Sequence, residues 1–260
     1  MRAIWLAAGT VFTSIVLVVA TALLYNGFAD ADPPIEVSRG SFPFHGSQVR
    51  LVVEDGVSDV LIQSGEAGEV VVERQVRWLR RKPEVTEEWG SGTLRVSSDC
   101  QVRDRSDRSG PLPCEVGYSI AVPPETSLDT STASTPLQLA NIPGKLRVTS
   151  VSGDVHMDGV PGDLHVRSGS GDVEATALSG ERADVEVGTG RVHLGFRQPP
   201  AEVRAVVRTS GTVSVEVPRR ATYDVTATAP KVDVDVPRQI GAPRRITASV
   251  AEGVIDICCD

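Results

Sequence analysis

Residues 144–161 read GKLRVTSVSGDVHMDGVP, and residues 162–179 read GDLHVRSGSGDVEATALS. The two stretches align at an offset of 18 residues without a gap. A third copy, GERADVEVGTGRVHLGF, starts at Gly180 with one inserted residue, and a degenerate fourth copy carries SGTVSVEVP at 210–218. A fixed period of about 20 residues with two short strands per copy is typical of a β-solenoid, in which stacking buries an apolar face that no copy buries alone.

A short element, Ser/Thr-Gly-x-Val, separates the two strands of each copy. The chain must turn sharply at this point, and glycine adopts a positive φ without the steric penalty of a Cβ atom. The sequence therefore predicts four equivalent repeat turns, at Gly153, Gly171, Gly190 and Gly211.

The period also predicts which side chains stack on one another. The interior is expected to contain Leu146, Val148, Val155, Met157, Leu164, Val166, Val173, Ala175, Val185, Val192 and Leu194. Three outward rows follow from the same alignment: Lys145, Asp163 and Arg182; Arg147, His165 and Asp184; Thr149, Arg167 and Glu186. Neighbouring strands lie about 4.8 Å apart, so the opposite charges in these rows are adjacent and favour an in-register parallel stack.

Most of the remaining chain also alternates between apolar and polar residues, as strands do. Strands are predicted at 48–53, 57–62, 69–76, 93–96, 118–122, 203–207, 213–217, 223–227, 232–236 and 246–250. We expect an all-β, parallel β-helix-like repeat stack that is preceded by one N-terminal transmembrane helix. The predicted divisions are an anchor at 1–29, a linker at 30–39, an N-terminal β region at 40–140 and the repeat solenoid at 141–260. Alternation alone also allows the N-terminal β region to be a small sandwich-like cap.

The N-terminal prediction depends on an uncharged run from Ala3 to Tyr25. These 23 residues, as a helix, would span roughly 30 Å of hydrocarbon. A cleaved signal peptide is the alternative, but its apolar core is usually only about 7–15 residues long. We expect an uncleaved, single-pass anchor in the cell membrane. Arg2 on the cytoplasmic side would place the C-terminal part outside the cytoplasm.

Charge and cysteine content narrow the functional classes. After the first 29 residues the chain carries 25 basic and 34 acidic residues, a net charge of −9, which disfavours nucleic-acid binding. In an extracytoplasmic compartment we expect a disulfide between Cys100 and Cys114, which bracket a polar segment. Cys258 and Cys259 could be free thiols, form an intermolecular bridge or link to another surface group.

The strand end YSIAVPP at 118–124 and the SGDV elements at 152–155 and 170–173 carry a family resemblance. Over roughly residues 40–257 the chain resembles the "putative adhesin" family of bacterial exported proteins, whose domain has no assigned function. The resemblance implies a β-helix-like fold on the cell surface and transfers no catalytic residue. Some members of that family are linked to envelope-stress signalling. The chain departs from many of them in its Cys100–Cys114 segment and its terminal cysteine pair.

The sequence offers little catalytic or cofactor chemistry. Stacking places His156, Glu174 and His193 in one outward row, flanked by Asp154, Asp158 and Asp172, and this row is a weak candidate for a divalent metal. A solvated polar face is the simpler interpretation and the one we favour, so no metal or cofactor is predicted. The chain contains no G-x-S-x-G, P-loop or dinucleotide-binding motif, and no catalytic residues are assigned.

These observations favour a non-catalytic, adhesin-like interaction module at the cell surface, with an envelope protein or glycan as its partner. A sensing or regulatory ectodomain for envelope stress is the alternative. An enzyme that acts on polysaccharide comes third. It would have to use Asp154, Asp158 and Asp172 without the aromatic platforms that usually hold sugars.

Overall fold

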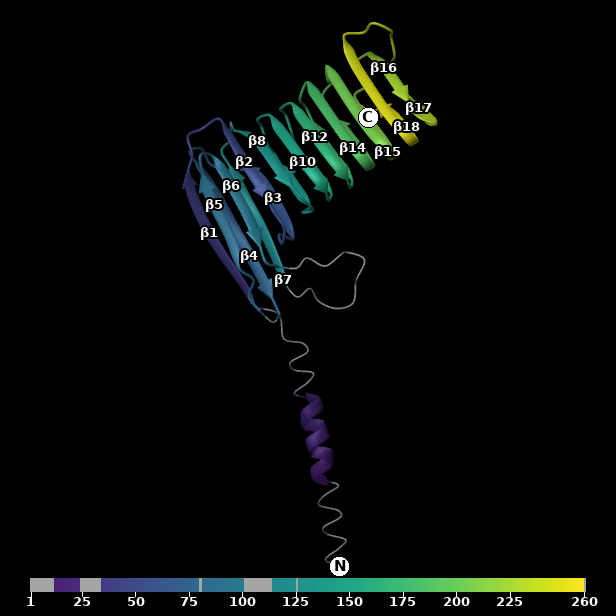
Figure 1. Cartoon of the computed structure of the whole chain (residues 1–260). Coiled ribbons are helices and arrows are strands. Elements are labelled where there is room, and N and C mark those ends of the chain that lie inside the picture. The colour runs from purple at the N-terminus through teal and green to yellow at the C-terminus, as the bar shows by residue number, and fades with distance from the viewer. Residues whose placement is uncertain (1–11, 24–33, 80, 101–113, 125, 260) are drawn as a thin grey trace, which may run out of the picture. The chain divides into compact units, whose positions relative to one another are not determined.

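A computed structural model describes residues 12–23, 34–79, 81–100, 114–124 and 126–259. The chain divides into two compact units, residues 1–34 and residues 35–260. All described strands belong to the second unit, and they form one 18-stranded sheet (Figure 1). The prediction of an all-β fold is therefore confirmed for this unit.

The first unit contains a helix at residues 12–23. Its apolar side chains face solvent on all sides; Phe12, Leu17, Val18 and Leu23 are each more than 60% exposed. Among the described residues, no helix has the length and apolarity needed to cross a membrane. Residues 1–11 and 24–33, which complete the predicted anchor and begin the predicted linker, lie outside the described residues.

The strands of the second unit form two faces, which we call face A and face B. Face A contains, in spatial order, β5 (Val85–Gly90), β6 (Thr93–Ser98), β2 (Gln48–Val53), β8 (Ser127–Thr132), β10 (Leu146–Ser152), β12 (Leu164–Ser170), the first halves of β14 (Arg182–Phe196), β15 (Glu202–Val217) and β18 (Arg244–Cys259), and β16 (Tyr223–Thr228).

Face B follows the same order on the other side of the core. It contains β1 (Ile35–Pro43), β4 (Glu69–Trp78), β7 (Cys114–Val122), β3 (Asp59–Ser64), β9 (Leu137–Ala140), β11 (Val155–Asp158), β13 (Val173–Leu178), the second halves of β14, β15 and β18, and β17 (Lys231–Val234). One strand from each face, or one long strand that passes through both, makes a coil of the stack.

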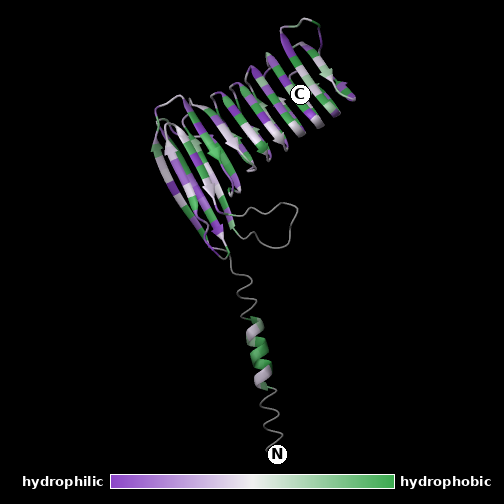
Figure 2. Ribbon diagram, viewed as in Figure 1, coloured by the Kyte–Doolittle hydropathy of each residue, from purple (hydrophilic) through white to green (hydrophobic). Residues whose placement is uncertain are grey.

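The parallel register confirms the predicted repeat. Leu146 pairs with Leu164, the offset of 18, and Leu164 pairs with Ala183, the offset of 19 that the inserted residue requires. On face B, Val155 pairs with Val173, and Val173 pairs with Val192. Alternation of apolar and polar residues is visible along the strands in Figure 2.

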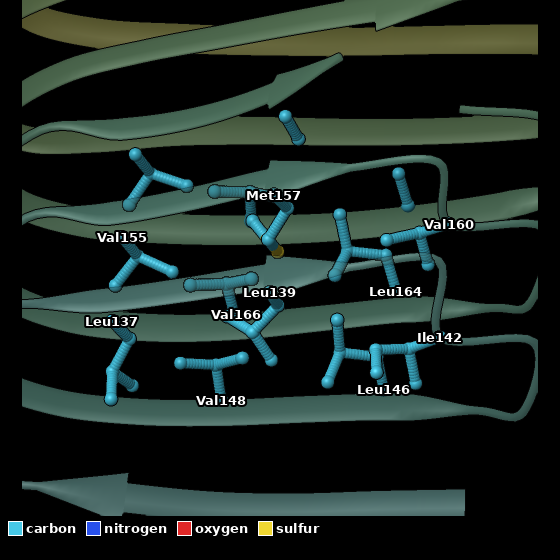
Figure 3. Close-up of a cluster of buried hydrophobic side chains, with 14 of the residues drawn as sticks. Leu137, Leu139, Ile142, Leu146, Val148, Val155, Met157, Val160, Leu164 and Val166 are labelled. Atoms are coloured by element: carbon cyan, nitrogen blue, oxygen red, sulfur yellow. The ribbon is translucent and has the colours of Figure 1, made fainter. Parts of the chain in front are cut away.

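Inward side chains of both faces form one hydrophobic core. Every residue predicted for the interior is buried, with at most 3% of its surface exposed. In Figure 3, leucine, valine and methionine side chains of successive coils stack above one another. The core also contains hydroxyl groups: Ser150 and Ser168 each donate to the carbonyl oxygen two residues ahead, at 2.9 and 3.0 Å, at the entry to a repeat turn. These bonds satisfy hydroxyls that burial would otherwise leave unpaired.

The predicted turn glycines form a continuous row at one corner of the stack. All four have φ between 111° and 155°. A Cβ atom at Gly171 would lie 2.6 Å from the carbonyl oxygen of Gly153, and the next glycines approach their neighbours more closely still. Gly253, which the period did not identify, continues the row beyond Gly211. Positive φ and the close approach of the next backbone both require glycine here.

The order of the coils departs from the order of the sequence at both ends. The C-terminal strand β18 lies between β15 and the final coil of β16 and β17. Likewise, β2 and β3 lie between the β6–β7 coil and the β8–β9 coil. Val203 of β15 therefore pairs directly with Ile246 of β18, although β16 and β17 lie between these two strands in the sequence.

The N-terminal β region combines both alternatives that the sequence left open. Its strands β2, β3, β6, β7, β8 and β9 continue the parallel stack, whereas β1, β4 and β5 add antiparallel pairs at the end. Residues 35–39, assigned to the linker, belong instead to β1. Alternation in this segment is short and follows two prolines, and its pairing with β4 stabilises it as a strand.

The cysteines fall into two classes. Cys100 and Cys114 form the predicted disulfide, with Cα atoms 5.8 Å apart, and so join the end of β6 to the start of β7. The segment 101–113 between them lies outside the described residues. Cys258 and Cys259 are free thiols at the end of β18. Adjacent residues of a strand point to opposite faces, and the Cys259 thiol donates to the Asp235 carbonyl at 2.8 Å.

Gly171→Val tests the glycine row. The new side chain would combine a φ of +111° with a clash against backbone, so we expect the free energy of unfolding to fall by about 3 kcal/mol or more. Urea unfolding followed by far-ultraviolet circular dichroism measures this loss. Gly90→Val is the matched control, because nothing lies within 4 Å of a Cβ atom at Gly90. Equal stability of the two variants would contradict the role of the row.

Candidate functional site

A groove of about 380 Å³ lies on face A, across the first residues of β10, β12 and β14 and beside β2 and β8. Six ionisable side chains line it: Lys145, Arg147, Asp163, His165, Arg182 and Asp184. These are the members of the first two outward rows that the sequence predicts. The groove is therefore a direct consequence of the repeat, because each coil contributes two outward residues from the start of its face A strand.

The two rows extend over more coils than the repeats in the sequence, and they alternate in charge except at His165, which lies between Arg147 and Asp184. The first row extends from Arg182 to Glu202, Arg245 and Asp224, which are paired in register. The second row runs through Arg50, Asp129, Arg147, His165, Asp184 and Arg204. Opposite charges thus face each other across neighbouring strands about 4.8 Å apart.

One end of the groove is held by a network around Asp184 and Glu186. Asp184 contacts Arg167 at 2.6 Å, Arg204 at 3.0 Å and His165 at 3.2 Å. Glu186 is the most buried of these acids, with 11% of its side chain exposed, and pairs with Arg204 at 3.2 Å and with Arg208. The third predicted row is also present, since Arg167 Nε lies 3.7 Å from Glu186.

The network shifts the ionisation of its members. Burial alone would raise the pKa of Asp184, but the hydrogen bonds and charges of Arg167 and Arg204 reverse this effect and hold the pKa below its ordinary value. Burial alone would also raise the pKa of Glu186, but the arginines around it hold this pKa below its ordinary value. Burial and the charges of Arg167 and Arg147 lower the pKa of His165 despite Asp184, so His165 is neutral at pH 7.

Within the described part of the chain, the remaining cations of the groove lack such ion pairs. Lys145, Arg147 and Arg182 are exposed and have no ion-pair partner among the described residues. Asp163 lies between Lys145 and Arg182 in the first row and offsets part of their charge. The lining of the groove thus has three cations and two carboxylates, an excess of one positive charge that can attract an anionic group, while Glu202 and Asp129 face Arg182 and Arg147 from the neighbouring strands.

The weak metal candidates lie on face B. His156, Glu174 and His193 occupy one row as predicted, beside a shallow groove of about 260 Å³ that His156 and Glu174 line. His156 Nδ1 lies 3.2 Å from Glu174 Oε2, and both side chains are half exposed. In the part of the chain that the structure describes, no group of three or more histidine, cysteine, aspartate or glutamate side chains is placed to hold a metal ion.

The aspartates of the polysaccharide-enzyme hypothesis have structural partners. Asp154 Oδ1 accepts a hydrogen bond from the backbone amide of Asp172 at 3.1 Å, and Asp172 Oδ1 accepts one from the amide of Arg191 at 2.9 Å. Asp158 accepts the Thr176 hydroxyl at 2.8 Å. The aspartate of each SGDV element thus links one repeat turn to the next coil.

One sequence family matches the part of the chain that contains the four predicted repeat turns. The family described as Toastrack DUF4097 matches residues 122–252, half of the chain. The chain belongs to this family. No curated protein matches the sequence.

Several solved structures of bacterial proteins are similar to this Toastrack chain. They include a putative cell adhesion protein from Clostridium sporogenes, at 13% identity and a TM-score of 0.36, which covers 88% of this chain and all of its own. A putative adhesin from Bacteroides fragilis has 13% identity, a TM-score of 0.39 and the same coverage. A putative adhesin from Parabacteroides merdae has 12% identity and a TM-score of 0.39, and covers 84% of this chain and 96% of its own.

Sequence reasoning missed two parts of the charge network that flanks the groove of the Toastrack chain. Arg204 and Arg208 lie in the degenerate fourth copy, where the alignment stopped. Arg50 and Asp129, which are 3.2 Å apart, precede the clear repeats. The alternation of charge at equivalent positions is the signal that could have found them, once the order of the coils is known.

Glu186→Gln tests the network through pH. A carboxylate whose pKa is lower in the folded state stabilises the fold above its unfolded pKa of about 4.3, and this contribution is lost as the pH falls through the folded value. We expect Glu186→Gln to lower the free energy of unfolding by about 2 kcal/mol at pH 7 and by much less near pH 3. Urea unfolding at both pH values measures this. Glu66→Gln, at an exposed carboxylate without an ion pair in the described part, is the control. A pH-independent difference would contradict the assignment.

Proposed function

We propose that the chain is a non-catalytic, adhesin-like interaction module of the cell surface, and that the groove of face A binds acidic groups of an extended envelope glycan. The observation that carries this proposal is the set of three exposed cations, Lys145, Arg147 and Arg182, without an ion-pair partner among the described residues. Charged groups in such a groove steer and position a partner of opposite sign.

The geometry of the groove favours a polymer over a compact ligand. Lys145 and Arg182 are separated by two coil spacings, or about 9.6 Å, so a chain with repeated acidic groups can contact both. The rigid sheet keeps these side chains on fixed positions, which limits the entropy lost on binding. Neutral His165 and the carboxylate of Asp163 between the cations provide polar partners for hydroxyl groups.

We further propose that residues 1–29 anchor the chain in the cell membrane, with the second unit outside the cytoplasm. The uncharged run at 3–25 supports this, and so do the apolar side chains that the helix at 12–23 exposes on all sides. The disulfide between Cys100 and Cys114 is suited to an oxidising compartment.

Charge reversal in the groove tests the proposal. Binding of the full chain, in a non-ionic detergent, to polygalacturonate is compared with binding to neutral dextran. We expect affinity for the acidic polymer, weakened by salt, and a loss of about tenfold in the Lys145→Glu/Arg182→Glu variant, since each exposed charge contact contributes up to about 1 kcal/mol.

Lys231→Glu is the matched control, because Lys231 is also exposed and has no ion-pair partner in the described part of the chain. It should retain the affinity of the original chain. Equal binding to dextran and polygalacturonate, or equal losses in the groove variant and the control, would refute the proposed site.

A further inference from the structure

A second positive region lies at the C-terminal end of the stack, away from the groove. It consists of the turn 218–222 after β15, the loop 235–243 that leads from β17 into β18, and the first two residues of β18, Arg244 and Arg245; we call these residues the terminal corner. Figure 1 shows the loop at the end of the row of coils, beside β16. The terminal corner contains five arginines and one carboxylate, and a second carboxylate, Asp224 of β16, contacts its loop, in a chain whose net charge is −8.

The arginines gather around the buried Tyr223. Its backbone pairs with Arg244 on one side and forms a bridge with Arg238 on the other. Arg220 is close enough that its charge, like that of Arg244, opposes the rise in the pKa of Tyr223 that burial causes. Among the described residues, the ion pair in this corner is the 3.2 Å contact of Arg219 with Asp235. Arg220 donates only to the Arg197 carbonyl, at 3.3 Å.

The loop of the terminal corner also carries an exposed isoleucine, which lies between Arg238 and Arg244 in the sequence. Ile240 is 96% exposed, more than any other large hydrophobic side chain in the described residues. It occupies the tip of a tight turn: Ala242 N donates to Gln239 O at 3.1 Å, and Gly241 follows Ile240 with a φ of +79°. This is the geometry of a type II turn.

The turn is anchored to the adjacent strand. Gln239 N donates to the Tyr223 carbonyl at 3.0 Å, and Gly241 N donates to the Asp224 carboxylate at 3.1 Å. The Asp224 carboxylate thus binds the backbone of the loop that carries Ile240. The exposed side chain is therefore held in place, and its exposure is a fixed property of the fold.

We propose that the terminal corner docks on an anionic lipid surface, with arginines at the level of the headgroups and Ile240 inserted at their boundary with the acyl chains. Cations close to an anionic membrane are attracted to it, and an apolar side chain beside them gains from leaving water. A single isoleucine on an exposed turn, in a segment that contains several arginines, matches a deformable surface. The proposal does not depend on the ligand of the groove.

The test follows the exchange of backbone amides at 238–242 in the full chain. The full chain is mixed with vesicles of neutral phosphatidylcholine, or with vesicles that also contain phosphatidylglycerol. Local exchange separates this corner from any insertion of the N-terminal segment. We expect slower exchange with anionic vesicles only, and loss of that protection in Arg238→Glu, in Ile240→Asp and at high salt.

Two variants serve as matched controls. Arg39→Glu reverses an exposed arginine on β1, and Val151→Asp replaces a side chain that is 69% exposed elsewhere in the stack. Both should keep the lipid-dependent protection at 238–242. Protection that is absent, that is equal with neutral vesicles, or that soluble polygalacturonate reproduces would overturn the proposal, the last because it would show an anion site without a need for lipid.

Discussion

The close approach of successive glycine backbones at one corner is the constraint on which the stack depends. With a Cβ atom at Gly171 only 2.6 Å from the Gly153 carbonyl, no other residue fits between consecutive coils at this point. The corner can therefore turn without a side chain of its own, and each coil lies directly above the last. The in-register apolar rows, such as Val155, Val173 and Val192, follow from this superposition. So does the dry interior made of small branched side chains, which fills the narrow space between the two faces.

The same superposition creates the groove. Because the coils are in register, outward residues at equivalent positions become neighbours, and a charge on one coil is compensated or opposed by the next. Alternation in the second row, from Arg50 through Asp184 to Arg204, stabilises the pairing on the outside. A slip of one residue would carry Arg147 and His165 into the core and Val148 to the surface. The charged face thus helps to specify the register, and where charges are left without partners it becomes available for recognition.

Much of this organisation follows from local sequence, because a repeat turns sequence alignment directly into spatial neighbourhood. The repeat was enough to predict the interior, the turns from Gly153 to Gly211 and the six ionisable residues that line the groove. The order of the coils at the ends could not be predicted in the same way. Strand β18 alternates like any other strand, and nothing in its own residues shows that it pairs with β15 across the skipped coil of β16 and β17. Gly253 was missed for this reason. It stacks on Gly211, whereas the period would place its neighbour in the coil of β16 and β17, which lies between the two glycines in the sequence. Side-chain geometry was the other limit, since Arg167 contacts Asp184 on the diagonal more closely than its direct neighbour Glu186.

The order of the last coils can be explained by the edge of the sheet. Every open stack of strands ends in an exposed edge strand. An edge strand offers unpaired backbone groups to other chains, and short, charged edges reduce this hazard. If the long β18 were the last coil, sixteen residues would be exposed along one edge. Placing it inside leaves the edge to the six residues of β16 and the four of β17, which carries Lys231 and Asp233. Tyr223 of β16 is further covered by its bridge to Arg238. This arrangement requires the chain to return from β17 to β18 through the loop 235–243. That loop carries Ile240 and Arg238, and Arg244 and Arg245 follow at the start of β18, so the solution to the edge problem also provides the stack with a protruding, positively charged end.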